Sequence, residues 1–573
     1  MGSELVRRAL ALVGVVIVAA GGAAGLTWNH VGRPVAAPSN PVHRDIESGP
    51  DPGATTVVAR PTTAGTTVQR LASPAAVRRA LASQKLAPKP RYLALFVLDG
   101  GKPDYLKVRN TPNLHALMAR GTVYRNAFDG ILESETPTGH ATIGTGSPPN
   151  KDGILSFGWA NSDNNRTTDL FDPGFIRKGG MEQIMSQAGA PSIATLIHAN
   201  EPNARVVALS GHKYYAADAL GGPDADAIIY YQGTPDGKYA PISTVGHAPP
   251  RSLLQEKSLT LPTTHLKVGA EDRLTMHLAR ETFRVMRPTA LLVNLPEFDW
   301  PLGHVWGADR DRKDVRTLMQ DFDRDLGSLM AEYYKAGILN QTLFVVTADH
   351  GFAPIYHQVT KQVLQAAVAK SGAKIISDTY HTAAYMWLDN LSQAPAAAAQ
   401  IALLKNRYIQ SVYFKERAAN GYDYVRASGL QGFHTAGMEA ANQYLLHSFD
   451  GVTGPEVVTF FAEDTASLPG GEAHWKGDHG GADWYSQHVP LVFSGAGAAH
   501  GVHTEPVRLQ DIAPTALALM GIAPTGMSGI PLADAMIHPS PAQIKQQRAV
   551  ARSLRPVVAA LQDEARREIQ AGL

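Results

Sequence analysis

Three apolar runs that each lead into an acidic residue constrain the fold of this chain most strongly. The run from Tyr92 to Leu98 is followed directly by Asp99. Two further runs, in TALLVNLPEFD and QTLFVVTADHG, lead to Asp299 and Asp349. A short continuous apolar run is typical of a strand that is buried on both faces of a parallel sheet. We therefore expect these segments to form strands of one sheet.

Helical patterns separate the predicted strands. In TPNLHALMARG, Thr111 and Pro112 form a helix start and Gly121 a stop. HVPLVFSGAG supplies a fourth strand. Strands that alternate with helices predict an α/β fold with a doubly wound, mostly parallel sheet and helices on both faces. Between the second and third strands, the residues predicted to lie on one buried helical face are Val315, Leu318, Phe322, Leu326, Leu329 and Met330.

The N-terminus has the composition of a membrane or export segment. Arg7 and Arg8 precede an uncharged run from Ala9 to Trp28, which is about long enough to cross a bilayer at ~1.5 Å per residue. Arginines before the run predict that the rest of the chain lies outside the cytoplasm. We predict an uncleaved transmembrane anchor within residues 1–30, with a cleaved signal as the alternative.

Composition also divides the remainder of the chain. Residues 31–90 are rich in Pro, Ala and Thr and are predicted to form a linker, with a short helix near Pro74 to Lys85. The C-terminal tail is predicted to be helical and broken near Pro556. The other predicted units are a catalytic domain over 91–540, inserted cap regions near 180–288 and 352–469, and the tail over 541–573.

Charge and cysteine content exclude several kinds of protein. The chain has 52 Lys and Arg against 51 Asp and Glu, so its net charge gives no indication of specific nucleic-acid binding. It has no cysteine, which excludes disulfides, Cys-ligated zinc and a Cys nucleophile. Histidine and carboxylate side chains are therefore the strong metal ligands available to it.

Acids and histidines are predicted to converge at one edge of the sheet. In an open α/β sheet, ligands bind beyond the carboxyl ends of the strands. Taken singly, each acid could merely cap a turn, but the joint pattern favours a site for two divalent ions. The candidate ligands are Asp99, Asp299, His304, Asp349, His350 and His479.

A stretch rich in hydroxyls and glycines, ESETPTGHATIGTGSPPNKDG, begins at Glu133. Pro137 disfavours helical geometry at the preceding Thr136, which we expect to be an N-cap with Pro137 at the first helical position. The Thr136 hydroxyl would then lie at a helix N-terminus, where a phosphate oxygen is favoured. The alternative is that Thr136 only caps the helix and the glycines only permit close packing.

Together these motifs resemble the alkaline phosphatase superfamily, specifically its nucleotide pyrophosphatase/phosphodiesterase-like branch with a Thr nucleophile. The resemblance extends from Leu93 to about Leu532 and rests on VLDGGKPDYL, TPTGHATIGTGSPPNKDGI, the Asp299–His304 element, TADHG and GDHG. It implies a two-zinc phosphoester hydrolase that acts through a phosphothreonine. The implied roles are Thr136 as nucleophile, one zinc on Asp99, Thr136, Asp349 and His350, and the other on Asp299, His304 and His479.

The chain departs from this family pattern at three positions. DWPLGH places four residues between Asp299 and His304 where relatives usually have three, and we expect Pro301 to let the loop bulge so that His304 still reaches. Phe157 stands where many relatives have a phosphate-binding Asn, with Asn161 as a nearby candidate. Lys213 and Tyr215 stand where monoesterases of the branch have a Lys-x-Arg pair, which favours diesters because a Lys alone supplies half the positive charge.

Several alternatives remain at this stage. A phosphate monoesterase could use the same site, and an anchored surface-binding protein with a degenerate site is a possibility from another class. Sulfatases need a C/S-x-P-x-R sequence that this chain lacks. A cofactor-independent phosphoglycerate mutase would use a Ser nucleophile. Nucleotides, lipid head groups and envelope phosphodiesters all suit a membrane-bound or secreted site outside the cytoplasm.

Overall fold

The computed structural model describes residues 74–571, except residues 162, 420, 431–434, 450, 452 and 469–473. The predicted anchor or signal over residues 1–30 and most of the predicted linker lie outside this part of the chain. Among the helices of the described residues, none combines the length and the apolar character that a membrane span requires.

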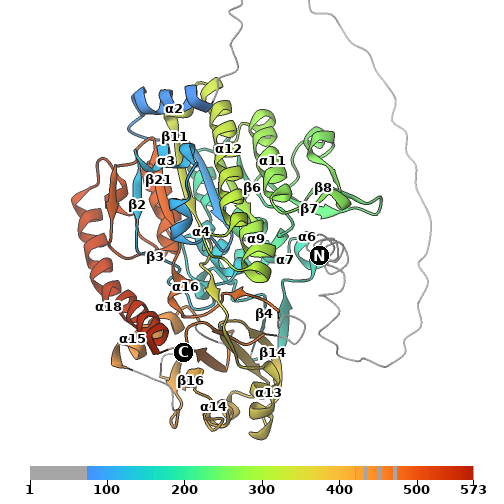
Figure 1. Cartoon of the computed structure of the whole chain (residues 1–573), viewed down its shortest axis with the longest axis vertical. Helices are drawn as coiled ribbons and strands as arrows, with labels where there is room; N and C mark the ends of the chain where they lie inside the picture. The colour runs from blue at the N-terminus through green and yellow to red at the C-terminus, as the bar shows by residue number, and fades with distance from the viewer. Residues whose placement is uncertain are drawn as a thin grey trace, which may run out of the picture.

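A ten-stranded sheet forms the centre of the molecule (Figure 1). The three predicted central strands lie side by side, and β1 pairs in parallel with both of its neighbours. The fourth predicted strand, β21, is antiparallel to β11. The strand order is β22 (Gly501–His503), β2 (Thr122–Tyr124), β21 (Leu491–Gly495), β11 (Thr342–Thr347), β1 (Tyr92–Leu98), β10 (Ala290–Leu295), β6 (Val206–Leu209), β7 (Ala227–Gly233), β8 (Lys238–Ser243) and β9 (Leu261–Pro262).

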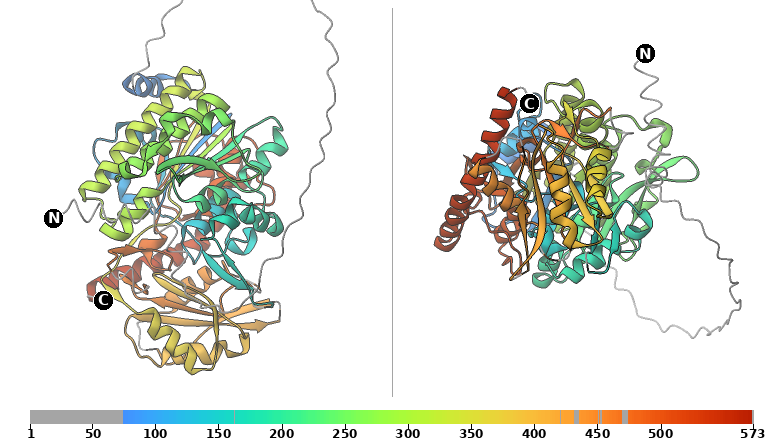
Figure 2. Two further views of the ribbon diagram at one scale, coloured as in Figure 1. Left: turned by 90° about the vertical axis from the view of Figure 1, so that its right-hand side faces the viewer. Right: turned by 90° about the horizontal axis from the view of Figure 1, so that it is seen from below.

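Helices cover both faces of this sheet (Figure 2). Alternate side chains of β1 enter two separate cores, with Phe96 in one and Leu95 in the other. The first core includes α3 (Pro112–Met118), α11 (Ala270–Met286) and α12 (Lys313–Lys335). The second includes α4 (Thr136–Thr145), α8 (Ile193–Asn200), α9 (Tyr214–Gly221) and α17 (Ile512–Leu519). The predicted doubly wound, mostly parallel α/β fold is confirmed.

The strand register brings the predicted acids to one edge. Leu98 pairs with Leu295 of β10, and Val97 pairs with Thr347 of β11. Asp99 and Asp349 therefore follow the carboxyl ends of neighbouring strands. Asp299 reaches the same edge after a short 3₁₀ turn that continues from β10.

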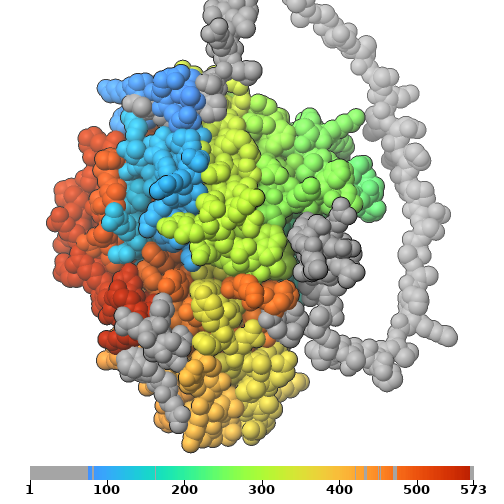
Figure 3. Space-filling model, viewed as in Figure 1, coloured from blue at the N-terminus to red at the C-terminus, as the bar shows by residue number. Residues whose placement is uncertain are grey.

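A second, antiparallel sheet lies beside this edge, within the region predicted as the later insertion (Figure 1). Its order is β14 (Ile375–Tyr380), β15 (Ala383–Leu388), β18 (Val457–Phe461), β16 (Ile409–Ala418) and β17 (Gly421–Arg426). One of its faces packs on α13 (Lys361–Lys370) and α14 (Ala394–Ala402). In the space-filling view this region, yellow to orange, is packed directly against the rest of the molecule (Figure 3). The earlier predicted insertion instead supplies β6 to β9 of the central sheet.

Helix predictions outside the site are confirmed with one exception. The short helix predicted near Pro74 is α2 (Pro74–Ser83), and the six predicted apolar residues of α12 are all buried. The predicted break at Pro556 is wrong, because α18 (Pro541–Ala571) continues through it. Leu554 and Val557, on either side of the proline, are buried in a core shared with α15 (Ala436–Leu446), and this burial offsets the lost hydrogen bond.

Candidate metal and phosphoester site

Thr136 is the first residue of α4 and is almost completely buried. The prediction that it is the N-cap is wrong: Glu135 has the extended backbone of the cap, and Thr138 Oγ1 accepts a hydrogen bond from the Glu135 N–H at 3.2 Å. Pro137 therefore occupies the second helical position, where its missing N–H is still harmless. The Thr136 hydroxyl remains at the N-terminal end of the helix.

The glycine in TPTGH lets α4 pack directly on the end of β11. A Cβ atom placed on Gly139 would lie 2.3 Å from the carbonyl oxygen of Asp349, which is far inside van der Waals contact. The next residue, His140, places Nδ1 3.2 Å from Asp349 Oδ2 and 2.8 Å from the Thr136 carbonyl oxygen. The helix that carries Thr136 is thus fixed to the strand end that carries Asp349.

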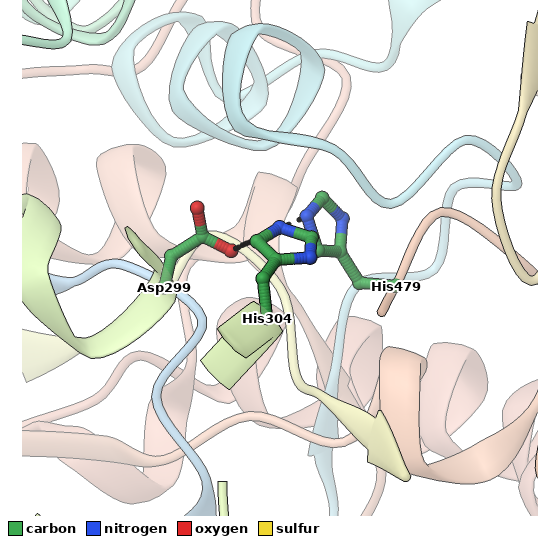
Figure 4. A group of neighbouring side chains, drawn as sticks. All are labelled: Asp299, His304 and His479. Carbon is green, nitrogen blue, oxygen red and sulfur yellow. Dashed lines mark ion pairs between the residues drawn. The ribbon is translucent and has the colours of Figure 1, made fainter. Parts of the chain in front are cut away.

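Asp299, His304 and His479 form the first group of candidate ligands (Figure 4). The Nε2 atoms of His304 and His479 lie 3.2 and 3.3 Å from the same oxygen, Asp299 Oδ1. All three side chains are buried. These three residues were predicted to hold one metal, and the structure brings them together.

A backbone kink accommodates the extra residue in DWPLGH. Asp299–Trp306 is a π-type helix in which Trp300 departs from helical geometry. Trp300 has the extended backbone angles φ −119° and ψ 124°, so the chain is kinked between Asp299 and the turn that carries His304. This kink takes up the extra residue, and His304 Nε2 lies 3.2 Å from Asp299 Oδ1 despite the longer spacing.

Asp99, Asp349 and His350 form a second group around Thr136. His350 Nε2 lies 3.7 Å from Asp99 Oδ1, 3.4 Å from Asp349 Oδ2 and 3.5 Å from Thr136 Oγ1. The Thr136 hydroxyl donates to Asp99 Oδ1 at 3.4 Å. Asp99 and Asp349 also form a possible ligand set with His140, and Asp99 and His350 form another with Asp299. The two predicted groups therefore adjoin.

The three candidate histidines are oriented alike. Nδ1 of His304 lies 3.2 Å from the Gly477 carbonyl oxygen, and Nδ1 of His479 lies 2.9 Å from that of Ser134. His350 Nδ1 lies 2.9 Å from the Gly351 carbonyl oxygen. A carbonyl only accepts, so each Nδ1 carries the proton and each Nε2 presents a lone pair to the site. This is the orientation that metal-binding histidines adopt.

Lys213 lies at the centre of the site and is buried. Its position at the start of α9 directs the side chain between the two groups of acids. The Nζ atom donates to Asp99 Oδ1 at 2.7 Å, Thr136 Oγ1 at 3.0 Å and Asp299 Oδ2 at 2.5 Å. Among the described residues, Lys213 is the only lysine or arginine that donates a hydrogen bond to Asp99, Thr136 or Asp299.

The electrostatics of the site favour bound cations. Burial, reinforced by the nearby Asp349 carboxylate, raises the pKa of Asp99 to about 7 although Lys213 opposes the shift. Burial lowers the pKa of His350 to about 3, so this imidazole is neutral at physiological pH, as ligation requires. Asp299 Oδ1 and Asp349 Oδ2 are buried without a hydrogen bond of good geometry. Buried carboxylate oxygens of this kind and the neutral His350 imidazole fit divalent metal ions.

Two other predicted positions lie away from the reacting atoms. Asn161 ends β4 (Gly158–Asn161), and its side-chain oxygen accepts from the Asp163 N–H at 2.9 Å; no described hydrogen bond joins it to the site. Phe157 stacks on Phe171 with ring centres 4.3 Å apart and meets the edge of Tyr215 at 5.0 Å. An aromatic cluster therefore occupies the positions where the resemblance would place an Asn and an Arg.

Sequence reasoning missed the residues that support the candidate ligands. Asn294 donates to Asp99 Oδ2 at 2.9 Å, and Asp478 Oδ1 lies 3.6 Å from His304 Nδ1. His140 had a sequence signal, because it lies one helical turn after Thr136. His381 comes from the second sheet, and nothing in its neighbouring sequence connects it to the site.

A family model for type I phosphodiesterase / nucleotide pyrophosphatase matches residues 93–441. The chain belongs to this family. Among curated proteins, this chain is similar to alkaline phosphatase PhoK of Sphingomonas sp., with 24% identity over 292 residues. The aligned part is 42% of this chain and 51% of PhoK, so the chain spans about half the length of this relative.

Solved structures share the fold. Wild-type alkaline phosphatase PafA has a TM-score of 0.62 and 16% identity, over 79% of this chain and 100% of PafA. Murine ectonucleotide pyrophosphatase/phosphodiesterase 5 has a TM-score of 0.52 and 16% identity, over 76% of this chain and 97% of its own. These structures support the alkaline phosphatase-like fold, and the family model confirms the predicted type I phosphodiesterase/nucleotide pyrophosphatase family.

Proposed function

We propose that this protein is a two-zinc phosphoester hydrolase with Thr136 as its nucleophile. The observation that carries the proposal is the position of Thr136 Oγ1, within 3.5 Å of Asp99, His350 and Lys213. A structure of the murine relative in complex with AMP is described as an inactive variant in which alanine replaces a threonine, which supports a catalytic threonine in this family.

The residues of the two groups would hold the metals. Because the chain has no cysteine, histidine and carboxylate are its ligands, and this set suits catalytic zinc. When bound, zinc ions stabilise the negative charge that develops on the attacking and leaving oxygens of a phosphoryl transfer. One ion would be held by Asp99, Thr136, Asp349 and His350, and the other by Asp299, His304 and His479.

The residues around Thr136 account for a two-step reaction. Thr136 Oγ1 bonds to phosphorus, loses its proton, and the bond to the first alcohol breaks as that alcohol takes up a proton. Lys213 donates to Oγ1 and so favours its deprotonated form, while Asp99 accepts from the hydroxyl and orients it. Water then attacks phosphorus, the bond from phosphorus to Thr136 Oγ1 breaks, and a proton from the water returns to Oγ1. The net reaction converts one phosphodiester and one water into a phosphomonoester and an alcohol.

The aromatic cluster supports a preference for diesters. A monoester carries a second negative charge, and Lys213 is already paired with two carboxylates. Tyr215, two residues after Lys213, has an aromatic ring in place of a cation. Phe171, which contacts this ring, is 51% exposed. An apolar wall suits a second ester group better than a second charge.

We therefore expect kcat/KM to be larger for bis-p-nitrophenyl phosphate than for p-nitrophenyl phosphate. Tyr215→Arg should lower this ratio by about tenfold or more, because a charge-assisted hydrogen bond contributes ~1.5–3 kcal/mol. Tyr214→Arg is the matched control, since it adds the same charge at the neighbouring residue, whose hydroxyl points to the Phe171 carbonyl oxygen. A wild-type ratio below one would instead identify a phosphate monoesterase.

The proposal also places the catalytic domain outside the cytoplasm, tethered by the N-terminal segment. Its support is the sequence alone, in which Arg7 and Arg8 precede the apolar run. Candidate substrates are nucleotides, lipid head groups and envelope phosphodiesters. In intact cells, external protease should digest the domain, and alkaline carbonate should leave it with the membrane. Recovery in the carbonate supernatant would indicate cleavage, and protection from protease would contradict the orientation.

A further inference from the structure

A residue of the second sheet reaches the site. His381 lies in the turn between β14 and β15, and its side chain is 17% exposed. Its Nε2 lies 2.9 Å from Glu135 Oε1, and its Nδ1 lies 3.1 Å from Asp478 Oδ1. Both carboxylates are fully buried, so the imidazole joins two charged groups that have little access to water.

The two carboxylates adjoin the proposed reacting groups. Glu135 is the N-cap of α4 and directly precedes Thr136. Asp478 directly precedes His479, and its Oδ1 lies 3.6 Å from Nδ1 of His304, one of the three residues in Figure 4. His381 thus connects the nucleophile helix to the group formed by Asp299, His304 and His479.

The backbone of the same turn docks on the GDHGG loop. Thr382 donates its N–H to the His479 carbonyl oxygen at 3.0 Å, and the His381 carbonyl accepts from the Ser467 N–H at 2.8 Å. The rings of His381 and His479 are parallel, with centres 5.5 Å apart. Gly480 has φ +93°, and a Cβ there would lie 2.9 Å from the His381 Cβ. The glycine allows the turn and the loop to approach this closely.

We propose that His381 is a positioning residue that fixes the distance between Thr136 and the group of Asp299, His304 and His479. The second sheet is then a part of the active site, since it supplies this connection. Partners of metal-ligating histidines set ring orientation, and their loss typically lowers metal affinity or activity by ~10–100-fold. A small displacement of a nucleophile has a comparable effect on turnover. The inference rests on the proposed function only where it concerns turnover.

Metal affinity is the first test, and it requires no activity. His381→Ala in the full-length protein should weaken binding of one of two zinc equivalents by about 10–100-fold, measured by competition with a chromogenic chelator. Loaded with Co²⁺, the variant should show an altered visible absorption band for that site alone. His381→Gln, which can keep one hydrogen bond, should give a smaller change. An unaltered affinity and cobalt spectrum in the folded alanine variant would overturn the proposal.

A double-mutant cycle tests whether His381 acts through Asp478. If it does, Asp478→Asn and His381→Ala should change zinc affinity non-additively, because the second change removes an interaction already lost. Additive effects would contradict a route through Asp478. Circular dichroism and thermal unfolding establish that each variant is folded.

His198→Ala is the matched control. His198 is a partly exposed histidine of α8 with its Nε2 3.0 Å from Asp226 Oδ2, and neither residue contacts the site. This variant should keep wild-type zinc affinity, and an equal loss there would contradict a specific role for His381. If the wild-type protein binds zinc but hydrolyses no phosphoester, the proposed function fails, while the affinity measurements still decide the role of His381.

Discussion

Replacing Thr136 with alanine should abolish phosphodiester turnover while zinc stays bound. The loss in kcat is expected to be on the order of 10⁴-fold or more, because removal of a covalent nucleophile leaves only binding and electrostatic stabilisation. Zinc should remain because Asp99, Asp349 and His350, which lie within 3.7 Å of one another through His350 Nε2, are all retained. Steady-state hydrolysis of bis-p-nitrophenyl phosphate and metal analysis of the same preparation measure both effects.

Two controls accompany this variant. Thr136→Ser keeps the hydroxyl and should retain a substantial part of the activity. Thr142→Ala removes another buried hydroxyl from α4, one that has no hydrogen-bond partner among the described residues, and should leave kcat nearly unchanged. Wild-type turnover by Thr136→Ala would refute the nucleophile assignment. Loss of zinc along with activity would show that Thr136 is needed for metal binding as well.

Replacing Asp349 with alanine should lower the zinc content from two equivalents to about one, because a hard oxygen ligand is lost from one group. Turnover should fall with it. The Asp349 carboxylate also receives the Gly100 N–H at 3.0 Å and faces His140, so some loss of stability is expected too. Inductively coupled plasma mass spectrometry after dialysis against metal-free buffer gives the stoichiometry.

Asp323→Ala separates loss of metal from loss of stability. Asp323 is also buried, and its Oδ1 accepts from the N–H groups of Asn113 and Leu114 at 2.8 Å, where it caps α3. Its removal should lower the melting temperature, at a cost of ~1 kcal/mol or more, without changing zinc content. If Asp349→Ala retained wild-type stoichiometry, this carboxylate would not be a ligand.

The sequence predicted the central sheet and the convergence of its acids because both follow from local patterns. A buried strand must be apolar throughout, so Asp99 marks where β1 ends. Parallel strands share a carboxyl edge, so Asp349 could be placed beside Asp99 without knowledge of any contact. The three predicted acids were thus found through strand ends.

Local geometry that depends on a single residue was less predictable. The Thr136-Pro137 pair is compatible with a cap at Thr136 or at Glu135, because proline is tolerated throughout the first helical turn. Pro556 was expected to end a helix, and the buried face of α18 outweighed that preference. The sequence DWPLGH contains no pattern that would distinguish the kinked segment at Asp299 from a bulged loop.

The supporting residues could not be predicted because they depend on which distant segments meet. Asp478 is recognisable only as a neighbour of His479, and its contact with His304 requires the folded loop. His381 contributes through a turn of a different sheet. The aromatic packing of Phe157 on Phe171 likewise follows from tertiary contact.

The first proposed ligand along the chain, Asp99, directly follows β1. The last, His479, precedes β21, almost 400 residues later in the sequence. The site therefore forms only when strands from distant parts of the chain have taken their places, a topology that folds slowly because distant segments must meet. Metal uptake would report completed folding of the domain. A zinc ion that binds only the folded state would in turn stabilise the domain, because binding draws the folding equilibrium towards that state.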